Sequence, residues 1–352
     1  MNLESLIRPA IQKINSKIAG IPKSDRSIRL DKGEFPYPPS PKAIAAIQQA
    51  ASSINRYPEV LTNKLRQVLA DYNQVSLDKI FAGNGSDDLI ELVLKICLEP
   101  GDEVILPIPT FFVYGAATEM LGGKVVSVQR TANFDLDLPA IIAAVTDRTK
   151  LIFIANPNNP TANASSRNTL IALLEQVNCL VVIDECYFEI CQQTVADLID
   201  RYPHLIILRS LSKGFGLAGL RIGYGITNPQ LVDYIYRVAQ IFSVNQLAIA
   251  AGIAAVQDQT YLTEKLTEIK TERAKLTKEL TGLGFQVYPS DTNFLFISSQ
   301  PLDQTAADVV SKLASQEIYV ADFGNKPGLD AYHLRIATGT SIENQRLLDA
   351  LR

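Results

Sequence analysis

Short runs of apolar and β-branched residues recur between about residues 79 and 227, and the segments between them have the periodicity of amphipathic helices. The runs read KIFAG, DEVILP, KVVSV, KLIFIA, CLVVID, LIILRS and RIGYGI, and two of the helical segments read SDDLIELVLKICL and SRNTLIALLEQV. Several runs stay apolar instead of alternating, which is typical of strands buried on both faces. The pattern predicts an α/β fold with a mostly parallel sheet covered by helices.

The pattern changes after residue 256. A long charged helix is expected over TEKLTEIKTERAKLTKELTGL, followed by strands at FQVY and NFLFI, a helix, strands at IYVA and HLRIAT, and a final helix. This mixture predicts a smaller α+β domain. We therefore expect an N-terminal segment over 1–38, a large domain over 39–256 and a small domain over 257–352. The proline-rich stretch FPYPPSP predicts an extended connector at the first boundary.

Composition and charge exclude several classes of partner. The chain has 352 residues, of which 47% are hydrophobic and 20% are charged, and its net charge is -4. It is long enough for a sizeable core and has no basic signature for nucleic acid or an anionic membrane. The longest apolar run, LAIAAGIAAV, is about half the length that spans a bilayer, and the N-terminus lacks signal-peptide features. We expect a cytoplasmic protein that binds small molecules.

The cysteines and histidines limit the available chemistry. The cysteines form no CxxC pair and lie in apolar surroundings, which predicts buried thiols in a reducing compartment. They are Cys97, Cys179, Cys186 and Cys191. Only His204 and His333 could supply an imidazole, and no GxSxG elbow is present. Neither a metal site nor a serine hydrolase triad is expected.

A glycine-rich turn opens a helix in FAGNGSDDLIELV. The helix begins with Ser86, Asp87 and Asp88, and the free N–H groups of such a first turn favour a phosphate. The alternative is that Ser86 or Asp87 merely caps the helix. Asp88 stands where a GxGxxG fingerprint needs its third glycine, and no GxxxxGK[ST] loop occurs, so a dinucleotide, ATP or GTP is not expected.

Three further motifs follow predicted strand ends, where parallel sheets bind ligands. IANPNNPT forms an asparagine turn. VVIDECYFEI places Asp184 at the end of a buried strand, where an acid needs a cation, although it could instead cap a helix or pair with an arginine. SLSKGFGLAGLR places Lys213 among serines and glycines, with Arg221 eight residues later. A loop lysine is usually a solvated charge, but a desolvated lysine amine is a nucleophile towards carbonyl groups.

Taken in order, these motifs resemble the fold type I aminotransferases that use pyridoxal phosphate, most closely the histidinol-phosphate aminotransferase family. The resemblance rests on LDKGEFPYPPSP, NRYPE, NPNNPT, IDECY, SLSKGFGLAGLRIGY and HLRIATGT, so it covers nearly the whole chain. It implies amino transfer from a donor to a 2-oxo acid, with histidinol phosphate and 2-oxoglutarate as the expected pair in histidine biosynthesis. It also implies a homodimer, in which residues 1–38 associate with the small domain and the partner subunit.

The resemblance implies a role for each residue around the cofactor ring. Lys213 would bind the cofactor covalently and move the proton during the reaction. Asp184 would pair with the protonated pyridine nitrogen. Asn159 and Tyr187 would hydrogen-bond the phenolate oxygen, with Tyr187 counted among the catalytic residues, and Phe111 in the PTFF turn would stack on the ring.

The resemblance also implies how the cofactor phosphate and the substrate are held. The phosphate would be bound by Gly85, Ser86, Asp87, Ser210, Ser212 and Arg221. In a homodimer, the partner subunit's Tyr57 would reach the same phosphate. The fork of Arg335 would bind the α-carboxylate of the donor, and Glu34 and Asn159 would complete the substrate site.

Three positions depart from the family pattern. GEFPYPP keeps Glu34 but lacks both asparagines of NENPYPP, and NPTA replaces NPTG at Ala162. In IYVADF, Ala321 stands where relatives with a phosphorylated substrate commonly carry arginine. Lys326 or a lysine of the N-terminal segment could replace the missing charge. The departure at Ala321 leaves the amino donor open, with an aromatic amino acid as the nearest alternative.

Two other functions share the same cofactor residues. One is a pyridoxal-dependent decarboxylase of a phosphorylated amino acid. The other is a regulatory or scaffold protein that binds the cofactor without catalysis. A protein that only binds has no need for a nucleophile set against an electron sink, so the intact Lys213 and Asp184 disfavour the regulatory function.

Overall fold

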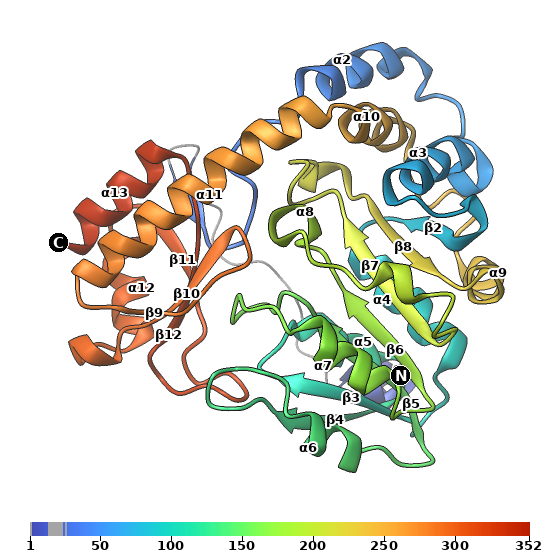
Figure 1. Ribbon diagram of the computed structural model, residues 1–352, viewed down its shortest axis with the longest axis horizontal. Helices are drawn as coiled ribbons and strands as arrows, with labels where there is room; N and C mark the ends of the chain where they lie inside the picture. Colours follow the sequence, from blue (N-terminus) through green and yellow to red (C-terminus); the bar gives the residue numbers. More distant parts are fainter. Residues whose placement is uncertain (1, 13–23, 25–26) are drawn as a thin grey trace.

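The computed structural model describes residues 2–12, 24 and 27–352 and contains two sheets (Figure 1). The larger sheet has seven strands in the order β2-β8-β7-β6-β5-β3-β4, and the smaller has five in the order β1-β11-β12-β10-β9. The α/β class with a second, α+β part is therefore confirmed. The boundaries at residues 38/39 and 256/257 remain predictions, and residues 13–23 and 25–26 of the expected N-terminal segment lie outside the described residues.

The larger sheet is mostly parallel, as predicted. Its strands are β2 (Ile80–Gly83), β3 (Glu103–Ile108), β4 (Lys124–Gln129), β5 (Thr149–Ala155), β6 (Leu180–Asp184), β7 (Leu205–Ser210) and β8 (Gly223–Thr227). Strands β4, β3, β5, β6 and β7 pair in parallel, whereas β8 runs antiparallel to both β7 and β2. The central strands β6 and β7 are almost wholly buried, but both ends of β4 are exposed because β4 lies at the edge of the sheet.

Helices cover both faces of this sheet, which explains why its central strands do not alternate in polarity. Along β5, Leu151 and Phe153 belong to one hydrophobic cluster and Ile152 and Ile154 to another. The first cluster includes residues of α4 (Ser86–Cys97), α5 (Phe112–Met120) and α9 (Pro229–Val238). The second includes residues of α3 (Asn63–Asn73), α6 (Leu138–Ala143), α7 (Arg167–Leu174), α8 (Phe188–Cys191) and α10 (Gln246–Gln257), and α10 packs on α2 (Pro41–Ala50).

The smaller sheet joins one strand from the first tenth of the chain to four strands from its last quarter. Its strands are β1 (Ile28–Leu30), β9 (Gln286–Val287), β10 (Phe294–Ser298), β11 (Ile318–Asp322) and β12 (His333–Ala337). β1 pairs in parallel with β11, and the remaining pairs are antiparallel. Helix α11 (Gln259–Gly282) runs from the larger sheet to the smaller one, which also carries α12 (Ala306–Ala314) and α13 (Ser341–Leu351) (Figure 1). Capping boxes stabilise the starts of α12 and α13.

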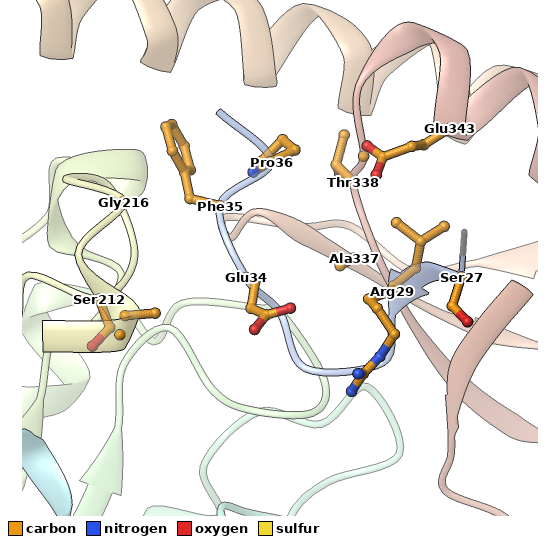
Figure 2. Close-up of a pocket in the computed structure, with 14 residues that line it drawn as sticks. Ser27, Arg29, Glu34, Phe35, Pro36, Ser212, Gly216, Ala337, Thr338 and Glu343 are labelled. Atoms are coloured by element: carbon orange, nitrogen blue, oxygen red, sulfur yellow. The ribbon is translucent and has the colours of Figure 1, made fainter. Parts of the chain in front are cut away.

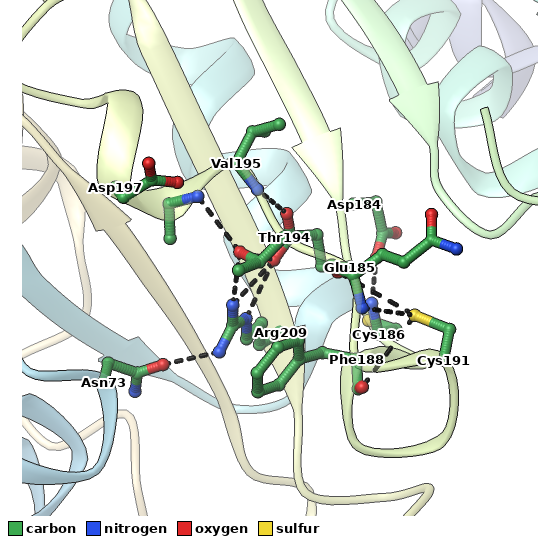
Figure 3. Close-up of polar contacts among 12 residues, drawn as sticks. Asn73, Asp184, Glu185, Cys186, Phe188, Cys191, Thr194, Val195, Asp197 and Arg209 are labelled. Carbon is green, nitrogen blue, oxygen red and sulfur yellow. Dashed lines mark hydrogen bonds and ion pairs between the residues drawn. The ribbon is translucent and has the colours of Figure 1, made fainter. Parts of the chain in front are cut away.

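A buried ion pair ties the ends of β6 and β7 together (Figure 3). Arg209 Nη2 lies 2.7 Å from Glu185 Oε2, and both side chains are almost completely buried. Arg209 also donates to Asn73 Oδ1 and Thr194 Oγ1, so its charged donors have several acceptors. The pair immediately follows Asp184 and immediately precedes Ser210. It therefore fixes the two strand ends from which the predicted site residues emerge.

The cysteines are free, but the expectation that all four are buried is wrong. Cys179 and Cys186 are buried, whereas Cys97 and Cys191 are only half-buried. Each of the latter two is the last residue of its helix, α4 or α8, where the chain approaches the surface. Within the described part of the chain, no cluster of side chains suits a metal ion and no helix suits a membrane span.

Candidate active site

Lys213 lies in the loop that follows β7, with its amine held by backbone. Its Nζ donates a hydrogen bond to the Gly33 carbonyl at 3.1 Å and lies 5.7 Å from the centre of the Tyr187 ring. Burial, helped by the nearby Arg335, lowers the pKa of Lys213 to about 8. A neutral amine is therefore accessible close to physiological pH, as a lysine nucleophile requires.

Asp184 ends β6 as a buried carboxylate, with hydrogen bonds to both of its oxygens. Its Oδ2 accepts from the Tyr114 hydroxyl at 2.6 Å, and its Oδ1 accepts from the Cys186 N–H at 3.0 Å. Burial raises the pKa of Asp184, and the hydrogen bonds from Cys186 and Tyr114 oppose that rise. Among residues 2–12, 24 and 27–352, no arginine or lysine forms an ion pair with Asp184; the nearest buried ion pair joins Arg209 to the next residue, Glu185. The N-cap of α8 is Tyr187, so Asp184 does not cap that helix. The capping and arginine-pair alternatives are therefore wrong, and a cationic ligand atom would complete the site.

The start of α4 presents backbone N–H groups without a capping side chain. Gly85 is the N-cap, with φ of 86°, and neither Ser86 nor Asp87 caps the helix, so the capping alternative is wrong here too. The acid that does contact this turn is Asp88, whose Oδ2 accepts an N–H of the preceding turn at 2.8 Å. A Cβ at Gly223 would lie 2.6 Å from Ser86 N, so glycine lets β8 pack against the helix start.

Three side chains add to this helix start. Arg221 Nη2 lies 3.4 Å from Asp87 Oδ2 and would collide with a Cβ at Gly85. Ser210 Oγ accepts the Ser212 N–H at 3.1 Å, and the buried Ser212 Oγ has no partner within the described chain. An unpartnered buried hydroxyl, a guanidinium and a helix N-terminus together suit a phosphate. With Lys213 and Asp184 nearby, the residues present fit pyridoxal phosphate.

Arg335 lies on β12 with its guanidinium held from two sides. Its Nη1 donates to Asn159 Oδ1 at 2.7 Å and its Nη2 to the Asp31 carbonyl at 2.6 Å, while Nε has no partner within the described residues. The guanidinium carbon lies 5.2 Å and 5.4 Å from the ring centres of Phe294 and Phe323. Burial lowers the pKa of Arg335, and a buried, oriented fork of this kind suits a carboxylate.

A cavity of about 330 Å³ adjoins these elements (Figure 2). Glu34 and Ser212 line it from one side, and Arg29, Thr338 and Glu343 line it from the smaller sheet and the start of α13. Glu34 is exposed, so its carboxylate is available to a ligand that enters the cavity.

Two of the predicted residues stand apart from this group. Phe111 is the N-cap of α5, half-buried, with its ring centre 5.5 Å from that of Tyr114. Tyr57 is 82% exposed and stacks on Phe242 with ring centres 4.5 Å apart.

Three groups at the site did not emerge from the sequence. Tyr114 bonds Asp184, the Gly33 carbonyl holds the lysine amine, and Asn293 Nδ2 donates to the Gly33 and Glu34 carbonyls at 3.1 Å and 3.0 Å. Tyr114 follows Phe111 at a helical spacing of three, which could have indicated that both face the site. Asn293 belongs to no motif, and a backbone carbonyl leaves no trace in a sequence.

Comparisons with known proteins place this fold and site in one class. Residues 25–351 match the family model described as aminotransferase class I and II. The chain belongs to the aminotransferase class I and II family.

Within that class the chain is similar to histidinol-phosphate aminotransferases. It is 36% identical to histidinol-phosphate aminotransferase 1 of Trichormus variabilis, over 94% of this chain and 93% of that protein. It is 37% identical to the histidinol-phosphate aminotransferase of Dehalococcoides mccartyi, over 99% and 98%. The crystal structure of histidinol-phosphate aminotransferase from Sinorhizobium meliloti in complex with pyridoxal-5'-phosphate matches with a TM-score of 0.91 and 26% identity, covering 99% of this chain and 96% of that one.

Proposed function

We propose that this protein is a pyridoxal-phosphate-dependent aminotransferase that transfers the amino group of histidinol phosphate to 2-oxoglutarate in histidine biosynthesis. The observation that carries the proposal is the partly buried amine of Lys213, whose lowered pKa suits a nucleophile. Two neighbouring features support it: the buried Asp184 carboxylate, which has no cationic partner among the described residues, and the start of α4, which suits a phosphate. The names of the curated relatives support the choice of substrate.

Pyridoxal phosphate, when bound, supplies an electron sink for the charge that develops at the donor's α-carbon. Lys213 would hold the cofactor through its Nζ, and its amine would move the proton at the donor's α-carbon. Asp184 would face the pyridine nitrogen and keep it protonated, and Asn159 and Tyr187 would hydrogen-bond the phenolate oxygen. Phe111 would pack against the ring.

The rest of the site positions the phosphate and the substrate. The cofactor phosphate would be held by Gly85, Ser86, Asp87, Ser210, Ser212 and Arg221. Arg335 binds the α-carboxylate of the donor, oriented by its bond to Asn159, and Glu34 lines the approach. Because Arg335 is already ordered, little side-chain freedom is lost when the substrate binds.

We further propose a homodimer in which the partner subunit's Tyr57 completes the phosphate site. The exposed side chains of Ile54, Tyr57, Ile241 and Phe242 support this proposal, because the ring stack of Tyr57 and Phe242 joins two surface segments that each expose apolar side chains. A second copy of the chain would cover them. We also propose that residues 27–38 of the N-terminal segment associate with the small domain, since β1 pairs with β11, whereas Arg8 donates to the Met120 carbonyl at the end of α5 in the large domain. We propose further that the enzyme works in the cytoplasm, where its small polar substrates are dissolved.

A second candidate function is transamination of aromatic amino acids. Ala321 is the direct partner of Arg335 across strands β11 and β12. Position 321 therefore supplies no charge for the phosphate group of histidinol phosphate. The rings of Phe294 and Phe323 beside Arg335 offer an apolar wall instead. Phenylalanine or tyrosine needs only Arg335 for its carboxylate and such a wall for its ring.

A substrate panel tests the proposed function. The purified holoenzyme is given 2-oxoglutarate with histidinol phosphate, phenylalanine, tyrosine or threonine phosphate, and glutamate and carbon dioxide are measured, with Lys213→Ala as the control. Glutamate from histidinol phosphate supports the first function. Glutamate from the aromatic donors alone supports the second, and carbon dioxide from threonine phosphate would replace both with a decarboxylase.

A further inference from the structure

We propose that Tyr114 is a positioning residue for Asp184, which fixes the direction and the charge of the carboxylate that faces the cofactor's pyridine nitrogen. The inference rests on the proposed function, because it concerns the same cofactor site. Tyr114 lies in the first turn of α5 and is completely buried. It belongs to none of the motifs that define the rest of the site.

The hydroxyl of Tyr114 makes the shortest hydrogen bond of Asp184. The O–H donates to Oδ2 at 2.6 Å, in the range of bonds to an ionised acceptor, while the Cys186 N–H donates to Oδ1 at 3.0 Å. One donor on each oxygen prevents rotation of the carboxylate. Each oxygen keeps further acceptor capacity, which leaves room for the N–H of a protonated ring.

The ring of Tyr114 is itself held in place. It stacks on Phe153 with ring centres 4.6 Å apart and planes 6° apart, and the Thr118 hydroxyl donates to the Tyr114 carbonyl at 2.8 Å. Its edge meets Phe111, with ring centres 5.5 Å apart and planes at 82°. Phe111 is the residue proposed to stack on the cofactor ring. Tyr114 therefore contacts both Phe111, proposed to pack on the face of the cofactor ring, and Asp184, proposed to face its nitrogen.

The chemistry of Tyr114 suits a permanent donor. Burial and the nearby Asp184 raise the pKa of the Tyr114 phenol well above its ordinary value, so the hydroxyl stays protonated at every pH at which the enzyme is active. A buried carboxylate depends strongly on such donors, because water cannot replace them. Without the Tyr114 hydroxyl, the remaining donors to Asp184 would both come from Cys186, its backbone N–H and its thiol, which is a weak donor.

Tyr114→Phe tests the inference, with Tyr224→Phe as its matched control. Both tyrosines are completely buried, and the Tyr224 hydroxyl bonds Asn73 Nδ2 at 3.3 Å and Arg209 but not Asp184, so Tyr224→Phe measures the effect of losing a buried hydroxyl that does not contact the carboxylate. The dissociation constant of pyridoxal phosphate from each apoenzyme is measured by fluorescence quenching, and kcat and KM for the best donor are measured with the holoenzyme. Melting temperatures of the apo forms verify folding, which the retained ring should preserve.

For Tyr114→Phe we expect kcat to fall by about tenfold or more, the cofactor dissociation constant to rise by a similar factor, and KM to change by less than about twofold. Tyr224→Phe should leave all three within about twofold. In an Asp184→Asn background, Tyr114→Phe should raise the cofactor dissociation constant by no more than about twofold, because the two residues act through one bond.

Two results would overturn the inference. One is a Tyr114→Phe enzyme whose kcat and cofactor affinity match those of the unmodified protein, and the other is an undiminished effect in the Asp184→Asn background. Failure of the proposed function would look different, because the unmodified protein itself would bind no pyridoxal phosphate or release no glutamate from any donor.

Discussion

Ala321 and Arg335 are direct partners across the antiparallel strands β11 and β12. Side chains at such positions project from the same face of a sheet and lie close enough to act on one ligand. Arg335 is buried and bonded to Asn159, so it marks the face that points to the site. A side chain at position 321 therefore lies beside Arg335 on the same face of the sheet.

We expect the unmodified enzyme to transaminate phenylalanine or tyrosine measurably alongside histidinol phosphate. Ala321→Arg should shift the ratio of kcat/KM values towards histidinol phosphate by about one to two decades, because a hydrogen bond to a charged group is worth roughly 1.5 to 3 kcal/mol. Ala321→Met, which adds length without charge, is the control. Equal shifts in the two variants would show that bulk rather than charge decides the preference.

A competing source of charge is Lys326, which is exposed in the loop after β11. If Lys326 serves the substrate phosphate, the unmodified enzyme should be strict for histidinol phosphate, and Lys326→Ala should abolish that strictness. Of the lysines of the N-terminal segment, Lys13, Lys17 and Lys23 lie outside the described residues, and Lys32 is exposed. If Lys326→Ala leaves the donor preference unchanged, Lys326 is excluded.

The amine of Lys213 should capture pyridoxal phosphate with a pH dependence of its own. Because burial lowers its pKa to about 8, the reactive neutral form increases as the pH rises towards that value and levels off above it. Stopped-flow absorbance of the apoenzyme mixed with cofactor should follow this curve. Borohydride reduction and peptide mapping should find the cofactor on Lys213, and label on another lysine would refute the assignment.

Asp184→Asn should damage catalysis far more than folding. The amide keeps the size of the side chain but cannot stabilise a positive ring nitrogen, so we expect kcat to fall by at least about two decades, each decade being about 1.4 kcal/mol of barrier. The apoenzyme should melt no lower than the unmodified protein, because burial already disfavours the charged carboxylate. A near-normal kcat would show that Asp184 has only a structural role.

The fold could be predicted from the sequence because the polarity pattern of each segment matches the burial that the segment has in the folded protein. The apolar run of β6 is explained by hydrophobic clusters on both faces, and the charged run of α11 by a helix on the surface between the two sheets. The edge position of β4 was not readable, because KVVSV looks as apolar as the central strands and only the strand order exposes its ends.

The site was predictable where chemistry and a motif share one segment, as at SLSK and IDECY. It was not predictable where a contact joins distant segments. Asn293 and Gly33 meet only because β10 and the segment after β1 approach each other in space. Ser86 and Asp87 looked like caps because capping residues are polar, but only the backbone φ of Gly85 reveals that the cap is a glycine.

Subunit exchange should show whether the sites are shared in a dimer. Lys213→Ala and Tyr57→Phe subunits, mixed and refolded together, should form heterodimers with one unmodified site and one doubly altered site, so activity should recover above that of either parent. Ile241→Asp, which places a charge in the exposed apolar segment beside Phe242, should weaken the dimer in sedimentation. A monomer that is fully active at working concentration would contradict the shared site.

The pairing of β1 with β11 has a consequence for how the chain is made. Ile28 lies opposite Ile318, so the first strand of the smaller sheet finds its neighbour only after nearly the whole chain has left the ribosome. At about 5 to 20 residues per second, the wait is roughly 15 to 60 seconds. The larger sheet, whose strands all lie between these two segments, emerges complete during that interval. Translation thus delivers all strands of the larger sheet before the β1–β11 pair can form.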